Sequence, residues 1–181
     1  MRKNLVSKYW FGIVSILIMV SRICYGNSDR EILSEKSILY REIMPIATTW
    51  KDAVLKKDIE VMVSYALPET QKYVRDNLQN KRSNLYRVFY DSRWNQQKGS
   101  HSVYDILKSA KRLKIVMVQH KSLEKHGSGV SVYYYDEDKI RPKFPLANEE
   151  MQLLIDKGNI ISMFFFKTEG RWYTSYELTK E

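Results

Sequence analysis

The C-terminal segment, residues 158–181, sets the strongest limits on the fold of this chain. Two stretches rich in β-branched and aromatic residues flank the turn sequence Thr168-Glu169-Gly170-Arg171, a pattern typical of a β-hairpin. In the stretch before the turn, both sets of alternating side chains are largely apolar. A hairpin that is apolar on both faces is not stable alone in water. We therefore expect it to lie inside a larger sheet that is covered on at least one face.

The N-terminus has the layout of a secretory signal peptide. Three basic residues precede an uncharged apolar run, residues 9–20, and Gly26 offers a small residue at a cleavage point. The apolar run is shorter than the roughly 20 residues of a membrane-spanning helix. We therefore predict that residues 1–26 are a cleaved signal peptide, that residues 27–181 form one domain, and that this domain is periplasmic or secreted.

Two alternatives remain for the leader. Arg22 is an unusual neighbour of a cleavage site, and residues 9–21 would then be an uncleaved inner-membrane anchor. Cys24 could instead carry a lipid, although Ile23 stands where a lipoprotein signal has a small residue. Because Cys24 is the only cysteine, a chain cleaved after Gly26 has no disulfide, no thiol catalyst and no cysteine-bound zinc.

The charge balance is basic. The chain has 30 basic and 21 acidic side chains, a formal charge of +9. The leader holds four of the basic residues and no acidic residue, so 26 basic and 21 acidic side chains, or +5, remain without it. This charge suits an acidic partner or an anionic envelope surface. The basic residues are scattered, and a leader directs the chain away from nucleic acid, so we expect no nucleic-acid binding.

Helical periodicity dominates the chain after the leader. Residues 29–57 carry apolar side chains along one stripe of a 3.6-residue period, with Pro45 inside the stripe. The stripe consists of Leu39, Ile43, Ile46, Trp50 and Val54. Proline lacks the amide that a helix interior needs, so we expect either a kink or two consecutive helices. Asp58 then fits the N-cap of a further short helix.

The pattern continues with helices and one loop. Residues 69–91 form an apolar helical face with a break near Asn80. Residues 93–102 are polar and are interpreted as a loop. Ser102 and Asp105 have the spacing of a capping box, which predicts that a short helix begins there.

From residue 111 onward the apolar period becomes that of strands. We expect a strand of about ten residues there, a second at residues 130–136, a short helix at residues 148–156, and then the hairpin. Helices followed by four strands predict an α+β fold, in which the N-terminal helices pack on one face of a curved four-stranded antiparallel sheet. No repeat or linker divides the chain.

Two stretches resemble nuclear-transport-factor-2-like (NTF2-like) domains, which are cystatin-like α+β cones. In WKDAVLKKD, residues 50–58, a tryptophan and an alanine on a helix precede an aspartate that starts the next helix. In GRWY, residues 170–173, a glycine lies in the last turn and a tryptophan on the last strand. The resemblance implies a sheet that wraps around a pocket. The helical part before the first long strand is longer here than is usual in that family.

This resemblance implies little about chemistry, because the fold carries isomerases, dehydratases, ligand-binding proteins and scaffolds. No family motif places catalytic residues on numbered positions of this chain. A related resemblance is to the periplasmic domain of VirB8, a component of type IV secretion systems. That comparison requires the leader to stay attached as a membrane anchor.

The histidines give one candidate catalytic residue. His101, His120 and His126 lack metal-ligand spacing, so we expect no metal site. His120 lies on a predicted strand and is the histidine expected near a pocket. As a general base it would need a carboxylate in reach, and Asp91 or Asp105 is the partner that we consider.

Aromatic residues give the candidate binding residues. Trp94 is the one aromatic residue of a polar segment and follows Arg93, a pairing that often marks a binding surface. Tyr133 and Tyr135 share one face of their strand, opposite Tyr134, and could offer hydroxyl groups to a ligand. We expect Arg93, Trp94, Tyr133 and Tyr135 to contact a ligand or partner.

The sequence has no hydrolase, metalloprotease or phosphate-binding motif. It therefore favours an exported bacterial envelope protein without a cofactor, a non-enzymatic domain that binds a partner protein or an apolar ligand. The alternatives are an NTF2-like enzyme of the isomerase or dehydratase kind and a membrane-anchored secretion scaffold.

Overall fold

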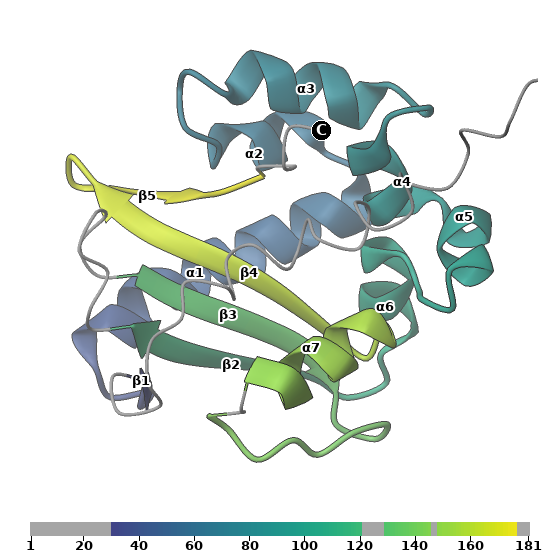
Figure 1. Ribbon diagram of the computed structural model, residues 1–181. Helices are drawn as coiled ribbons and strands as arrows, with labels where there is room; N and C mark the ends of the chain where they lie inside the picture. Colours follow the sequence, from purple (N-terminus) through teal and green to yellow (C-terminus); the bar gives the residue numbers. More distant parts are fainter. Residues whose placement is uncertain (1–29, 121–128, 146–147, 177–181) are drawn as a thin grey trace, which may run out of the picture.

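The computed structural model describes residues 30–120, 129–145 and 148–176, which form an α+β fold (Figure 1). One antiparallel sheet has the strand order β1-β2-β3-β4-β5. Its strands are β1 (Arg30–Ile32), β2 (Leu113–His120), β3 (Gly129–Asp136), β4 (Ile160–Thr168) and β5 (Arg171–Thr174). The helices are α1 (Ile38–Lys56), α2 (Ile59–Ser64), α3 (Gln71–Gln79), α4 (Asn84–Tyr90), α5 (Ser92–Gln97), α6 (Val103–Ser109) and α7 (Asn148–Asp156).

The expectations for the leader, residues 1–26, for its alternative as an anchor, and for His126 lie outside the described residues. Within the described ranges, no helix combines the length and the apolar character that crossing a membrane requires.

The C-terminal hairpin is confirmed. Thr168 of β4 pairs with Arg171 of β5 across the two turn residues. These residues, Glu169 and Gly170, have φ angles of 51° and 77°. Two consecutive positive φ values are typical of the tight turn that matches the twist of a hairpin. Glycine adopts this conformation without steric cost, which explains its place in the turn.

β1 is the strand that sequence patterning does not reveal. The period predicts helix from residue 29, whereas Arg30–Ile32 form β1 and pair with β2. Helix α1 begins only at Ile38, where the Ser37 side chain accepts a hydrogen bond from Tyr40 N (3.1 Å). A strand of three residues is too short to show an alternating period, and the open edge of β2 determines its conformation. The sheet therefore has five strands, and the expectation of four was wrong.

Helix α1 continues through Pro45 as a single helix, so two consecutive helices are not formed. The predicted apolar stripe faces the protein interior: Ile43, Trp50 and Val54 are fully buried. Burial of this stripe outweighs the hydrogen bond that the missing proline amide cannot make.

The predicted helix starts are confirmed, but the predicted loop was wrong. Asp58 accepts a hydrogen bond from Val61 N (3.1 Å) at the start of α2, and Ser102 accepts one from Asp105 N (3.1 Å) at the start of α6. The expected break near Asn80 separates α3 from α4. Residues 92–97, however, form helix α5 rather than part of a loop. This helix is polar and short, so it shows no apolar period.

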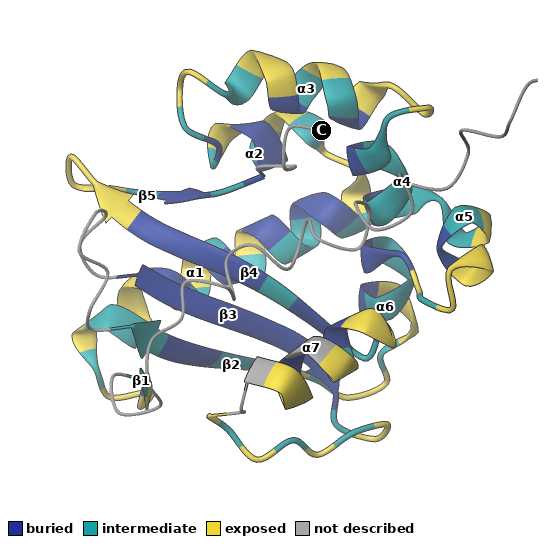
Figure 2. Cartoon of the chain, in the orientation of Figure 1, coloured by how far each residue is buried: buried dark blue, intermediate teal, exposed yellow. Residues whose placement is uncertain are grey.

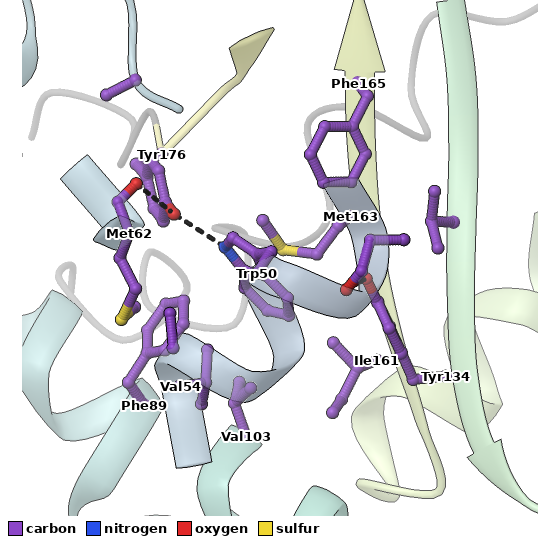
Figure 3. Close-up of a cluster of buried hydrophobic side chains, with 14 of the residues drawn as sticks. Trp50, Val54, Met62, Phe89, Val103, Tyr134, Ile161, Met163, Phe165 and Tyr176 are labelled. Carbon is purple, nitrogen blue, oxygen red and sulfur yellow. Dashed lines mark hydrogen bonds between the residues drawn. The ribbon is translucent and has the colours of Figure 1, made fainter. Parts of the chain in front are cut away.

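The main core lies between the sheet and helices α1 to α4 and α6. Trp50 is its centre, and its indole Nε1–H donates to the hydroxyl of Tyr176 (2.7 Å), which in turn donates to Met62 O (3.0 Å; Figure 3). The hydroxyl of Tyr134 in β3 donates to Ala47 O in α1 (2.9 Å). These buried hydrogen bonds join α1 to the sheet and, through Tyr176, to α2.

The opposite face of the sheet is covered as well. Helix α7 lies in front of the sheet in Figure 1, on the side away from α1. Its residues Met151 and Ile155 pack with Tyr133, Tyr135 and other side chains of β2 to β4 in a second buried cluster. All of β3 and most of β4 are consequently buried (Figure 2). Helices thus cover both faces, whereas the sequence predicts them on one.

Candidate functional site

A cavity of about 250 Å³ lies at the end of the sheet where β4 begins. Helices α4, α5 and α6 form one side of it, and α7, Gly158 and the first residues of β4 form the other. Its aliphatic walls are Val88, Val103, Ile106, Ile155, Ile160 and Ile161. We refer to this space as the α5–α7 cavity.

The α5–α7 cavity lies where the two buried clusters meet. Ile160 and Ile161 are consecutive in β4 and therefore point to opposite faces of the sheet. Ile161 belongs to the main core together with Val103 of α6, and Ile160 belongs to the second cluster together with Ile155 of α7. Two layers that pack well separately converge here and leave space between them.

Trp94 is the predicted binding residue that the structure places at the cavity. It lies on α5, half-buried, and lines the cavity. The Asp91 carboxylate accepts a hydrogen bond from the Trp94 backbone N (3.0 Å) and thereby caps the start of the helix. Lys98 Nζ lies 4.2 Å from the centroid of the indole ring, a cation–π contact at the cavity wall. Arg93 is exposed and does not line the cavity.

Asn95 is the site residue that the sequence did not reveal. It is 5% exposed and lines the cavity one residue after Trp94. Its Nδ2 donates to Arg87 O (2.7 Å) and to Asp91 O (2.8 Å), at the junction of α4 and α5. The sequence signal for this role is weak, since an asparagine four residues after an N-cap aspartate is common on polar surfaces.

Gly158 brings the two sides of the cavity into backbone contact. Its φ is +62°, and a Cβ atom at this position would lie 2.7 Å from His101 N and 3.1 Å from Ser100 Oγ. Only glycine allows the turn between α7 and β4 to approach the loop between α5 and α6 so closely. His101 is exposed at the rim of the cavity.

His120, the candidate general base, lies far from the cavity. It pairs with Gly129 of β3, which in turn pairs with Phe166 of β4. Phe166 is six residues along β4 from Ile160 at the cavity. At ~3.3 Å per residue this separation is about 20 Å. The cavity and His120 are therefore at opposite ends of the sheet.

Within residues 30–120, 129–145 and 148–176, neither the hydrogen bond of His120 nor the charge that acts on it comes from a carboxylate. Its Nε2 lies 2.8 Å from Ser131 Oγ. Burial, together with the positive charge of Arg30, lowers the pKa of His120 to about 4, so the imidazole is neutral at pH 7. The Asp91 carboxylate caps α5, and the Asp105 carboxylate accepts a hydrogen bond from Ser102 Oγ (2.7 Å) at the start of α6. The structure does not bring either carboxylate to His120.

Tyr133 and Tyr135 lie beneath the segment before α7 and do not line the cavity. The Phe144 ring centroid is 5.2 Å from that of Tyr133 and 5.8 Å from that of Tyr135. Both tyrosines are buried, and burial raises the pKa of the Tyr133 hydroxyl despite its hydrogen bonds to Ser131 and Ser162. In this structure the two side chains contribute to packing of the second cluster.

Residues 30–120, 129–145 and 148–176 contain no group of three or more His, Cys, Asp or Glu side chains placed to hold a metal ion. No protein-family model matches the chain, and no curated protein or solved structure is significantly similar to it.

Proposed function

We propose that this protein is a non-enzymatic binding domain whose α5–α7 cavity takes a small, largely apolar molecule. The cavity itself carries the proposal: about 250 Å³ bounded mainly by aliphatic side chains and the Trp94 ring. Aliphatic walls without a packing partner forgo dispersion contacts that a bound molecule supplies. The predicted leader and the NTF2-like resemblance support an exported, cone-shaped domain of the bacterial envelope as the setting.

The size of the cavity fits a small molecule. A 150 Å³ apolar cavity accommodates benzene, so a cavity of this size has room for roughly ten non-hydrogen atoms. Lys98, His101 and Asp156 at the rim are exposed polar residues. A protein partner would need apolar surface around the mouth. The exposed large apolar side chains of the described residues are Ile32, Ile38, Tyr73 and Leu153, and none of them lines the cavity.

An NMR titration of the ¹⁵N-labelled protein with anisole, a small neutral ether, tests the proposal. We expect saturable shifts of the Trp94 indole and of backbone amides around Ile106. The Ile106→Phe variant extends a ring into the cavity and should abolish these shifts. Leu153→Phe is the matched control, because Leu153 is 51% exposed on α7 and does not line the cavity.

The folded state of both variants is checked from the dispersion of their NMR spectra. Loss of the shifts in Ile106→Phe and their persistence in Leu153→Phe would support binding in the cavity. An absence of saturable shifts in the unmodified protein, or equal shifts in both variants, would contradict it.

A further inference from the structure

We infer that the ligand of the α5–α7 cavity is a neutral molecule with a hydroxyl or N–H donor, which the side-chain oxygen of Asn95 accepts. This inference rests on the proposed binding function and names the chemistry that the cavity selects. It is drawn from the hydrogen bonds of Asn95 and from the position of the other polar groups of the lining.

The orientation of the Asn95 amide is determined by its neighbours. Its Nδ2 lies 2.7 Å from Arg87 O and 2.8 Å from Asp91 O. Both partners are carbonyl oxygens, which only accept, so the NH₂ group must face them and both of its hydrogens are used. The hydrogen-bonding capacity left to this side chain is that of the acceptor Oδ1.

Asn95 Oδ1 is a hydrogen-bond acceptor in a lining that is mainly aliphatic. Asn95 is 5% exposed and lines the cavity, and within the described part of the chain no donor reaches its Oδ1. A ligand donor that bonds to Oδ1 takes the place of a water molecule there, so its gain is the net free energy of one exchanged hydrogen bond. A hydrogen bond to Oδ1 would also join the two bonds that the Asn95 NH₂ group donates to the carbonyls of Arg87 and Asp91. Hydrogen bonds linked in this way polarise and strengthen one another.

The remaining polar groups favour a neutral ligand. Lys98 and Asp156 both line the cavity, carry opposite charges and are exposed, so they remain in contact with water. Their charges give the mouth no net preference for one sign. A charged ligand group among the aliphatic walls would lose its hydration without an opposite charge in compensation. A hydroxyl or N–H group instead needs only the one acceptor.

Benzyl alcohol and anisole are isomers that differ in the presence of a donor, and they make a matched pair of probes. An apolar space without an acceptor would bind anisole more tightly, because a hydroxyl group costs more to remove from water. With Oδ1 available, we expect benzyl alcohol to bind about 2- to 10-fold more tightly than anisole, the ratio that one net hydrogen bond supplies. We also expect benzyl alcohol to shift the Asn95 side-chain NH₂ signals more than anisole does.

Both measurements use the unmodified protein, because Asn95→Ala would also remove the bonds to Arg87 O and Asp91 O. Tighter binding of benzyl alcohol with a shift of the Asn95 signals would establish the inference. Binding of both probes in the cavity with anisole equal or tighter would overturn it and leave the proposed function standing. Failure of both probes to bind would overturn the proposed function as well.

Discussion

The main core around Trp50 and the end of the sheet around the α5–α7 cavity are built in different ways. In the core, the polar atoms of Trp50, Tyr134 and Tyr176 are paired with one another or with backbone carbonyls. At the end of the sheet where β4 begins, the two buried clusters leave a cavity of about 250 Å³. There the NH₂ group of Asn95 is bonded to backbone carbonyls, and its Oδ1 is left as an acceptor. Under the proposed function, stability and binding would therefore depend on separate regions, since ligand sites require incomplete packing.

The largest loss of unfolding free energy is expected from a substitution in the main core. Trp50→Ala removes a fully buried indole and leaves the hydroxyl of Tyr176 without its donor. We expect a loss of about 3–5 kcal/mol in the free energy of unfolding, because the change creates a large cavity. Urea unfolding followed by circular dichroism measures this loss. A loss below about 1 kcal/mol would show that Trp50 is not the centre of the core.

Gly158→Ala should have the next largest effect and should also change the cavity. The added Cβ would lie 2.7 Å from His101 N at a φ of +62°, so strain and a clash act together. We expect a loss of about 2 kcal/mol in unfolding free energy and weaker binding of anisole.

Gly99→Ala is the matched control for this prediction, because its φ is +72° and nothing lies within 4 Å of the added Cβ. Its loss should be about 1 kcal/mol, from backbone strain alone. Equal losses at the two glycines would show that the close approach at Gly158 contributes nothing.

Acidification should destabilise the region of His120 and leave binding unchanged. The pKa of His120 is about 4 in the folded protein, below its ordinary value of 6.5. The unfolded chain therefore binds the extra proton between pH 6.5 and 4, and stability falls as the pH falls through this window. The loss is about 1–2 kcal/mol, allowing for the partial exposure of the ring.

The difference in unfolding free energy between the unmodified protein and His120→Gln, measured from pH 7 to pH 4, isolates this contribution. The glutamine cannot titrate but can still bond to Ser131. The same pH dependence in both proteins would contradict the assignment. Because the cavity is about 20 Å away along the sheet, the affinity for anisole should not follow this titration.

The smallest effect is expected at Lys57, which ends α1 with a φ of 56°. Its Nζ lies 5.4 Å from the ring centroid of Tyr90 and 5.2 Å from that of Tyr104. Lys57→Gly and Lys57→Ala both remove these contacts, but only glycine also removes the backbone strain. We expect the glycine variant to be more stable than the alanine variant by about 1 kcal/mol in thermal unfolding. Equal stability would show that this turn carries no strain.

Much of the fold is encoded locally and could be predicted. The turn at Glu169-Gly170 and the caps at Asp58 and Ser102 depend on residues within a few positions of one another. Strand β1 could not be predicted, because Arg30–Ile32 become a strand only beside the edge of β2, 86 to 90 residues later. The helix at residues 148–156 was predicted, but its position on the sheet face opposite α1 was not. That position depends on tertiary packing, which the local sequence period does not show.

The site was predicted only in part, for the same reason. Trp94 was selected as an aromatic residue in a polar segment, and it lines the cavity. Tyr133 and Tyr135 were selected because their strand face could offer hydroxyl groups to a ligand, yet Phe144 packs against them. Whether an aromatic residue lines a space or fills one depends on segments distant in sequence. The role of Asn95 depends likewise on the meeting of α4, α5, α6 and α7.

The most direct test of the binding claim is a crystal structure of the protein soaked with bromobenzene, with the bromine located by its anomalous scattering. We expect one dominant peak inside the α5–α7 cavity, among Trp94, Ile106 and Ile155, and no such peak in crystals of the Ile106→Phe variant. A bromine distribution confined to the protein surface, with the cavity empty in the unmodified protein, would contradict the account.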